Sequence, residues 1–219
     1  MIKNKDFIEI EFTGRVKGGE IFDSNIKEDL EKLHHNHEHQ IEAKPIVICL
    51  GESMFLHGVE EFLVNKPEPD TPADYEVELS PEKAFGMRDS KLVQAIPMGV
   101  FNQNNLTPFP GAVFNFDGRM AKILAVSGGR IIADFNNPLA GKTLIYKIRV
   151  LKKIEDTNEK IKAFNRFLFK EELQFKISDK NLILEVQKPL VNFAELFRDK
   201  YKSIFGLELE IKEKEKLSQ

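Results

Sequence analysis

The chain has 219 residues, enough for more than one compact unit with a core of its own. Its 32 Lys and Arg nearly balance its 35 Asp and Glu, so it lacks the basic excess expected of a protein that binds nucleic acid or an anionic membrane. No apolar run is long enough to cross a bilayer, and residues 1–10 lack the apolar core of a signal peptide, so we expect a cytoplasmic protein.

The first predicted element is a β-hairpin. Residues 7–12 alternate between apolar and polar side chains, as in a half-buried strand. The turn-forming run Lys17-Gly18-Gly19-Glu20 follows, and residues 21–22 resume the extended pattern. Residues 26–43 break the alternation with charges and histidines, which predicts a long solvated loop before a buried strand at residues 46–50.

A short helix is predicted within residues 52–65. Its apolar side chains recur at helical spacing on one face, although Gly58 lowers the helix propensity; they are Phe55, Val59, Phe62 and Leu63. The proline-rich residues 66–74 predict a turn, and the alternation of residues 75–79 predicts another strand.

A smaller β pattern starts near Met87. Two turn dipeptides, Asp117-Gly118 and Gly128-Gly129, separate three β-rich stretches, which predicts a meander. The run TLIYKIRVLKKI at residues 143–154 alternates again, with Leu144, Tyr146, Ile148 and Val150 on one face. We expect this strand to pair with the N-terminal strands.

Residue usage changes near Glu155, because twelve of the thirteen glycines lie at or before Gly141. We interpret this change as a domain boundary. The tail beyond it predicts a helix, a hairpin around residues 179–181, a second helix that ends at Gly206, and a last strand. The second helix should turn Phe193, Leu196, Phe197, Tyr201 and Ile204 inward. This α-β-β-α-β tail carries no motif connected with chemistry.

The sequence has no nucleotide-binding loop, dinucleotide fingerprint, HExxH motif or nucleophile elbow. Its single cysteine, Cys49, lies in the apolar run IVICL, where burial would suppress a thiol nucleophile. What distinguishes the chain is its aromatic content of eighteen Phe and no Trp. Any one of these phenylalanines is most simply explained as ordinary core.

Several stretches resemble, in order, an FKBP-type peptidyl-prolyl cis/trans isomerase. They are FTGRVKGGEIFDSN (12–25), PIVICLGE (45–52), HGVEEFL (57–63), SPEKAFG (80–86) and NNPLAGKTLIYKIRVLKKI (136–154). The resemblance spans about the first 154 residues and includes an interruption after AFG, where SlyD-like bacterial proteins and long archaeal members carry an insert-in-flap domain. The tail resembles the extra C-terminal domain of the archaeal long forms.

The resemblance implies an α+β protein with three domains. An FKBP-like antiparallel sheet wrapped on a short helix would comprise residues 1–87 and 134–154. A β-rich insert-in-flap (chaperone) domain would occupy residues 88–133, and a small α+β C-terminal domain residues 155–219. The implied activity is rotation of X-Pro bonds in unfolded or partly folded polypeptides that contain proline. It requires no cofactor and involves neither nucleic acid nor membrane.

The resemblance also places ten residues in or around the catalytic pocket: Phe12, Phe22, Asp23, Ile46, Phe55, Leu56, Val59, Phe85, Leu139 and Tyr146. It implies that the backbone N–H of Leu56 holds a substrate carbonyl, that Tyr146 and Phe85 form walls, and that Asp23 orients polar groups at the rim. From the residues alone, Asp23 would be a turn or capping carboxylate.

Two positions in the pocket depart from the family pattern. Val59 stands where many members have tryptophan, and Phe85 lacks the hydroxyl of the tyrosine expected there. We therefore expect lower activity on small peptides and poor binding of the macrolide that names the family. The same departures keep open an alternative function, a holdase chaperone with little isomerase turnover.

A second apolar surface, on the insert, would hold unfolded chain and raise the effective concentration of prolyl bonds beside the isomerase site. The candidates for this substrate-binding surface are Phe101, Phe109, Val113, Phe114 and Leu124. Each of them taken singly is better explained as insert core, but so small a domain should not bury all five.

Four of the five histidines fall within six residues, at His34, His35, His37 and His39. Clustered imidazoles bind nickel, zinc or copper, but this spacing matches no closed structural zinc site. We expect a solvated loop with adventitious Ni or Zn binding, and metal handling is a third candidate function. His57 is expected at the surface or at the pocket rim.

Overall fold

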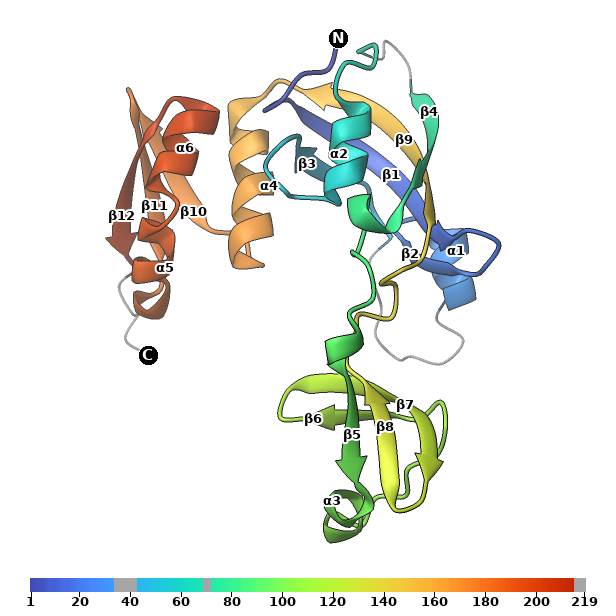
Figure 1. Ribbon diagram of the computed structural model, residues 1–219. Helices are drawn as coiled ribbons and strands as arrows, with labels where there is room; N and C mark the ends of the chain where they lie inside the picture. Colours follow the sequence, from blue (N-terminus) through green and yellow to red (C-terminus); the bar gives the residue numbers. More distant parts are fainter. Residues whose placement is uncertain (34–42, 69–71, 215–219) are drawn as a thin grey trace. The chain divides into compact units, whose positions relative to one another are not determined.

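The computed structural model describes residues 1–33, 43–68 and 72–214 and divides into two compact units (Figure 1). Unit 1 comprises residues 1–14, 21–77 and 146–219, and unit 2 comprises residues 15–20 and 78–145. The fold is mixed α and β, with largely antiparallel sheets. The finer division into three domains stays a prediction.

A five-stranded sheet forms the centre of the chain. Its order is β2 (Ile21–Ser24), β1 (Phe7–Val16), β9 (Leu144–Ile154) and β4 (Ala73–Leu79), and β3 (Ile46–Cys49) also pairs with β1. The position of β9 between β1 and β4 confirms the predicted pairing of that strand with the N-terminal strands. Its alternation is confirmed too, because Leu144, Tyr146, Ile148 and Val150 are all buried.

Two short helices accompany this sheet. Helix α2 (His57–Leu63) is shorter than predicted, and Phe55 precedes it, while Val59 and Leu63 are fully buried. Helix α1 (Lys27–Leu33) occupies part of the predicted loop, so the loop prediction was wrong there. Only Leu30 of α1 is buried, which leaves too little helical periodicity for the sequence to reveal.

The tail consists of α4 (Thr157–Phe169), β10 (Gln174–Ser178), β11 (Asn181–Val186), the 3₁₀ turn η3 (Lys188–Leu190), α5 (Val191–Glu195), α6 (Arg198–Phe205) and β12 (Glu208–Glu213). Strand β11 pairs antiparallel with β10 and parallel with β12. The helix predicted after Pro189 is interrupted between α5 and α6. Leu196, expected inward, lies at that interruption and is 75% exposed.

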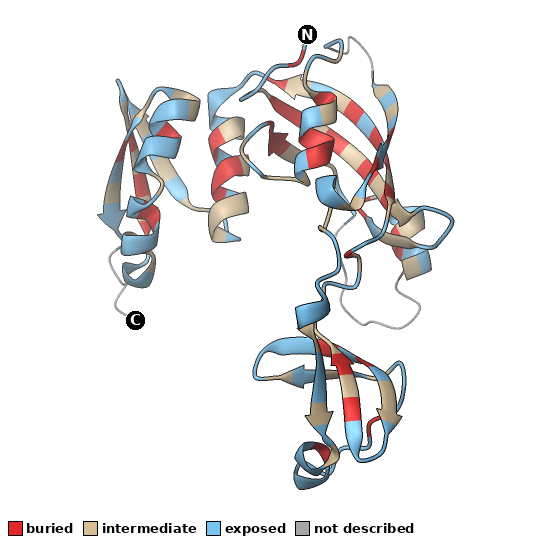
Figure 2. Cartoon of the chain, viewed as in Figure 1, coloured by how far each residue is buried: buried red, intermediate tan, exposed pale blue. Residues whose placement is uncertain are grey.

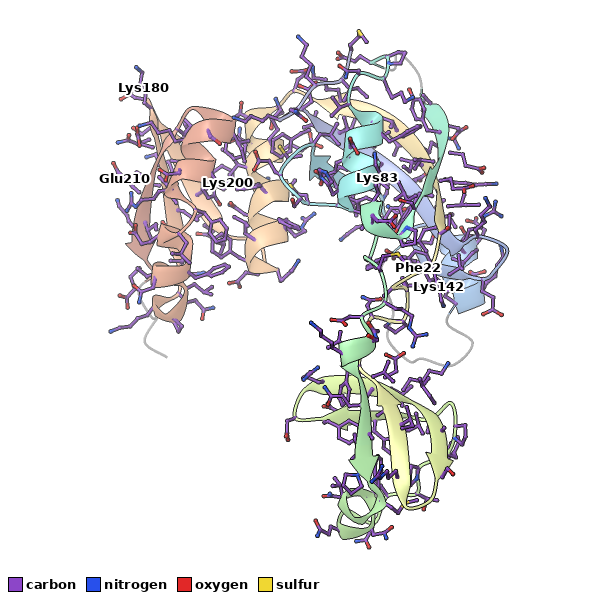
Figure 3. The ribbon with its side chains drawn as sticks, in the orientation of Figure 1. Phe22, Lys83, Lys142, Lys180, Lys200 and Glu210 are labelled. Carbon is purple, nitrogen blue, oxygen red and sulfur yellow. The ribbon has the colours of Figure 1, made fainter. Side chains whose placement is uncertain are left out.

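Helix α4 and the tail share a hydrophobic core with the first sheet. Phe7 of β1 and Cys49 of β3 belong to the same buried cluster as Ile161 and Phe164 of α4. Figure 2 shows buried positions along α4 and along β1 and β3. Lys200 of α6, labelled in Figure 3, forms an ion pair with Glu52. Packing therefore continues across the change in composition near residue 155.

Unit 2 is built around a four-stranded antiparallel sheet in the order β5 (Val93–Pro97), β8 (Arg130–Asp134), β7 (Arg119–Ser127), β6 (Val113–Phe116). Helix α3 (Met98–Gln103) follows β5, and the 3₁₀ turns η1 (Pro81–Lys83) and η2 (Ser90–Leu92) precede it. Both predicted hairpin turns are confirmed, because residues 117–118 and 128–129 have the positive φ angles that two-residue turns require. No helix in the described ranges is long and apolar enough to cross a membrane.

Candidate active site

Four aromatic side chains of unit 1 contact one another: Phe12, Phe22, Phe55 and Tyr146. We call this group the aromatic cluster. The Tyr146 ring meets Phe55 at 5.6 Å and Phe22 at 5.9 Å, both edge to face. Phe12 meets Phe55 at 4.7 Å and Tyr146 at 6.2 Å. Phe12 and Tyr146 are buried, whereas Phe22 and Phe55 are half-buried. The cluster therefore has a dry interior and an accessible apolar edge.

Gly14 of β1 makes room for the Tyr146 ring. A Cβ atom on Gly14 would lie 2.8 Å from Cε1 of Tyr146 and 3.0 Å from Cζ of Phe22. Any larger residue would have to displace the central ring of the cluster. Sequence reasoning did not single out Gly14, although a glycine inside a strand often marks such a close approach.

Glu60 of α2 is only 1% exposed and holds the loop in front of its own helix. Its carboxylate accepts hydrogen bonds from the backbone N–H groups of Gly51 at 2.8 Å, Ser53 at 3.3 Å and Phe55 at 2.7 Å. Charge-assisted bonds of this kind offset the cost of burying the carboxylate. Glu60 thus fixes the backbone that presents Phe55. The sequence analysis missed it, because the side chain lies beside the apolar face predicted for the helix.

Leu56 follows directly after Phe55 and provides the N-terminal cap of α2, with φ −64° and ψ 124°. Its carbonyl accepts from the N–H groups of Val59 at 2.8 Å and Glu60 at 3.1 Å. Within the described part of the chain, no atom accepts a hydrogen bond from the Leu56 N–H. A backbone donor next to the Phe55 ring is therefore available to a ligand.

The polar groups near the aromatic cluster are Tyr146 and Asp23. Burial raises the pKa of the Tyr146 phenol, and the charge of Asp23 raises it further, so the hydroxyl stays protonated. Partial burial of the Asp23 carboxylate raises its pKa, against the opposing effect of the hydrogen bond from the Ser24 backbone. Asp23 nevertheless keeps contact with solvent. Tyr146 thus gives the cluster one neutral hydrogen-bond donor, and the exposed Asp23 is close enough for its charge to act on that donor.

The remaining predicted pocket residues differ in position. Ile46 is half-buried at the start of β3, and Val59 is fully buried in α2. Phe85 and Leu139 are half-buried in unit 2. Their place beside the aromatic cluster stays a prediction.

The five surface candidates on the insert separate into exposed and buried residues. Phe109, Val113 and Leu124 are 62%, 55% and 42% exposed. Phe101 is 1% exposed and belongs to the core of unit 2, where its ring contacts the half-buried Phe114 at 5.4 Å. Phe101 therefore cannot contribute to a surface, and the core interpretation holds for it.

His34, His35, His37 and His39 lie outside the described residues. Among the residues that are described, no group of three or more His, Cys, Asp or Glu is placed to bind a metal. His57 is exposed, as expected. Cys49 is buried, as expected. Burial raises the pKa of its thiol to about 12, and the nearby charge of Glu52 acts in the same direction, so the thiolate that a nucleophile needs is disfavoured.

Comparison with known proteins bears on both units. A family model described as the IF domain of FKBP26 matches residues 94–139, within unit 2. The short-type peptidyl-prolyl cis-trans isomerase of Methanocaldococcus jannaschii is 30% identical over 150 residues, which is 68% of this chain and 92% of that protein. The FKBP-type peptidyl-prolyl cis-trans isomerase SlyD of Treponema pallidum is 30% identical over 176 residues, covering 78% of this chain and 86% of its relative.

The role of Glu60 can be tested by Glu60→Ala. Three backbone N–H groups would lose their acceptor, so we expect the free energy of unfolding to fall by about 1–3 kcal/mol in a urea titration. Glu60→Gln should recover part of the loss, because one acceptor oxygen remains. The exposed Glu28→Ala is the control and should change stability by less than about 0.5 kcal/mol. Equal effects at both positions would contradict the assignment.

Asp23→Asn should stabilise the protein increasingly as the pH rises. The raised pKa means that the folded state binds the Asp23 proton more tightly than the unfolded state does. The wild-type protein therefore loses stability as the pH climbs from the ordinary value of 3.8 through the raised pKa. Asparagine removes this loss. Urea titrations of both proteins across this range provide the measurement, and a difference in stability that stays constant with pH would refute the prediction.

Proposed function

Because the chain belongs to the FKBP-type peptidyl-prolyl cis-trans isomerase family, we propose that its aromatic cluster is the place where it rotates X-Pro peptide bonds. The observation that carries this proposal is the pairing of an accessible aromatic edge with the Leu56 N–H, which forms no hydrogen bond with any described residue. The chain is accordingly an isomerase, and its substrates are polypeptides that contain proline.

Rotation of an X-Pro bond breaks no covalent bond, so it needs no nucleophile, metal or cofactor. Its barrier of about 18–20 kcal/mol comes from the loss of amide resonance. The planar amide is more polar than the twisted one, so apolar walls such as Phe22 and Phe55 favour the twisted form relative to water. The aromatic contacts of Phe12, Phe22 and Phe55 with one another and with Tyr146 support this assignment.

The Leu56 N–H is the natural partner for the carbonyl of the residue before proline. It emerges at the start of α2, where Glu60 fixes the preceding backbone through Phe55. A donor that is already oriented loses no conformational entropy when the substrate binds. The protonated hydroxyl of Tyr146 supplies a second polar contact deeper in the cluster, where burial keeps it neutral.

Leu56→Pro tests this assignment with little disturbance of the backbone. The φ of Leu56, −64°, already matches the value that proline imposes, so the substitution removes the N–H and keeps the turn. We expect kcat/KM to fall about tenfold, the worth of one hydrogen bond of roughly 1.4 kcal/mol. The readout is the acceleration of a proline-limited refolding reaction at substoichiometric enzyme.

Leu56→Ala is the matched control, because it shortens the same side chain and keeps the N–H. A folded Leu56→Pro variant with the kcat/KM of Leu56→Ala would rule out the donor role. If the intact chain fails to accelerate refolding yet suppresses aggregation, the holdase alternative replaces the isomerase.

We further propose that the insert captures unfolded chain. On the β6–β7 hairpin, Val113 pairs across from Lys122, and Met120 lies two residues before Lys122 on the same face. Leu124 lies at a register shift between β7 and β8. Val113, Met120 and Leu124 are 55%, 57% and 42% exposed, while the opposite face carries the core residues Ala121 and Ile123. Several large apolar side chains that stay exposed on one small domain are a reason to expect a binding surface there.

Replacing Val113, Met120 and Leu124 together by serine should therefore raise KM for an unfolded protein substrate about tenfold, because tethering no longer raises the local concentration of prolyl bonds. Turnover of a short prolyl peptide should not change. Leu196→Ser, an exposed apolar position in unit 1, is the control. Equal losses on both substrates would refute this division of labour.

A further inference from the structure

Two polar side chains are buried at the end of β2. Ser24 is 5% exposed, and Asn25, the next residue, is 8% exposed. A buried polar group costs free energy unless it is hydrogen-bonded, so its partners show which parts of the structure it holds together. The hydrogen bonds of these two side chains run to β1, to the start of α1 and to the segment before β3.

The Asn25 amide joins β1 to the segment before β3. Its Oδ1 atom accepts a hydrogen bond from the backbone N–H of Phe12 at 2.7 Å. Its Nδ2 atom donates to the carbonyls of Ile10 at 3.0 Å and Lys44 at 3.1 Å. The surrounding backbone therefore presents one donor and two acceptors. An Asn amide satisfies all three, whereas an ionised Asp cannot donate and a Ser hydroxyl has only one hydrogen.

The strand pairing explains why an amide is needed at this point. Strand β1 pairs with β3 as far as Ile10, which lies opposite Ile46. The same register, continued by two residues, would place Lys44 opposite Phe12, but β3 begins only at Ile46. The Asn25 amide bridges the N–H of Phe12 and the carbonyl of Lys44 instead. The side chain thus replaces the missing end of the strand.

Both backbone polar groups of Phe12 are held by residues 24 and 25. While the amide of Asn25 takes the Phe12 N–H, the Phe12 carbonyl accepts from Ser24 Oγ at 2.9 Å and from the Asn25 backbone N–H at 3.3 Å. The Phe12 ring is buried and meets Phe55 at 4.7 Å and Tyr146 at 6.2 Å. Because buried side chains are closely packed, fixing the Phe12 backbone also fixes one side of the aromatic cluster.

We propose that Asn25 is a positioning residue for isomerisation, one that holds the Phe12 ring against Phe55 and Tyr146 and so sets the shape of the apolar surface on which the X-Pro bond twists. This inference rests on the proposed function. The amide is buried and its hydrogen bonds are internal, so its effect on the substrate passes through Phe12. A displacement of about 1 Å in a catalytic site can lower the rate by up to about 100-fold.

A double-mutant cycle between Asn25 and Phe12 tests this inference in the full chain, with a short prolyl peptide as substrate. Asn25→Ala should lower kcat/KM about tenfold in the otherwise wild-type protein. In a Phe12→Leu background the same substitution should lower it less than about threefold, because the ring that Asn25 positions is absent. Residues that act independently would give equal fold-changes in both backgrounds, and that result would overturn the proposal.

Loss of stability alone is separated from loss of positioning by urea titration of every variant and by a matched control. Tyr201→Phe removes another buried hydrogen bond, the one to Asn165 in the tail, and should leave kcat/KM unchanged. If Asn25→Ala does not fold, Ser24→Ala takes its place in the cycle. It removes one of the two hydrogen bonds to the Phe12 carbonyl, and we expect a loss of about threefold that disappears with Phe12→Leu.

The wild-type rate shows which claim fails. A wild-type chain that does not isomerise the peptide would refute the proposed function and this inference with it. An active wild-type chain with an equally active, folded Asn25→Ala variant would refute the role of Asn25 and leave the isomerase assignment intact.

Discussion

The position of the Tyr146 ring is the constraint on which the site depends. The ring occupies space that any side chain at Gly14 would fill, with only 2.8 Å between an imagined Cβ and Cε1 of Tyr146. Because Gly14 lies on β1 and Tyr146 on β9, the neighbouring strands must keep their register for the ring to fit. Phe22 and Phe55 then meet its edges. Sheet geometry thereby sets the shape of an apolar surface.

Glu60 fixes the backbone of the loop before α2, which the sheet does not fix. A buried carboxylate costs free energy, and here three N–H groups of one loop offset that cost. Among the described residues, the next donor, the Leu56 N–H, has no hydrogen-bond partner. A catalyst that forms no covalent intermediate depends on such preorganised contacts, because they act on the twisted amide without further rearrangement. The hydrogen bonds of Glu60 thus stabilise the loop and also fix the backbone that leads to the Leu56 N–H.

The sequence revealed the features that local chemistry determines. Alternation predicted β9, and the dipeptides at residues 117–118 and 128–129 predicted both hairpin turns of the insert. The family resemblance identified the aromatic residues of the cluster, but it gave none of the distances between their rings. Helix α1 and the interruption before α6 depend on contacts between distant segments, so no local pattern predicted them. Gly14 and Glu60 were missed for the same reason, since each matters through a partner far along the chain or off the helical face. For Phe101, the preference for core over surface was correct.

The tail carries no catalytic motif, but it packs against the first sheet. Ile161 and Phe164 of α4 share a buried cluster with Phe7 and Cys49, so α4 is held against β1 and β3. Phe7 and Cys49 are cross-strand partners, so the side chains that meet α4 lie on one face of the β1–β3 pair. Without this helix that apolar face would be exposed to water, and burying it is the main contribution that α4 makes to the stability of the first sheet.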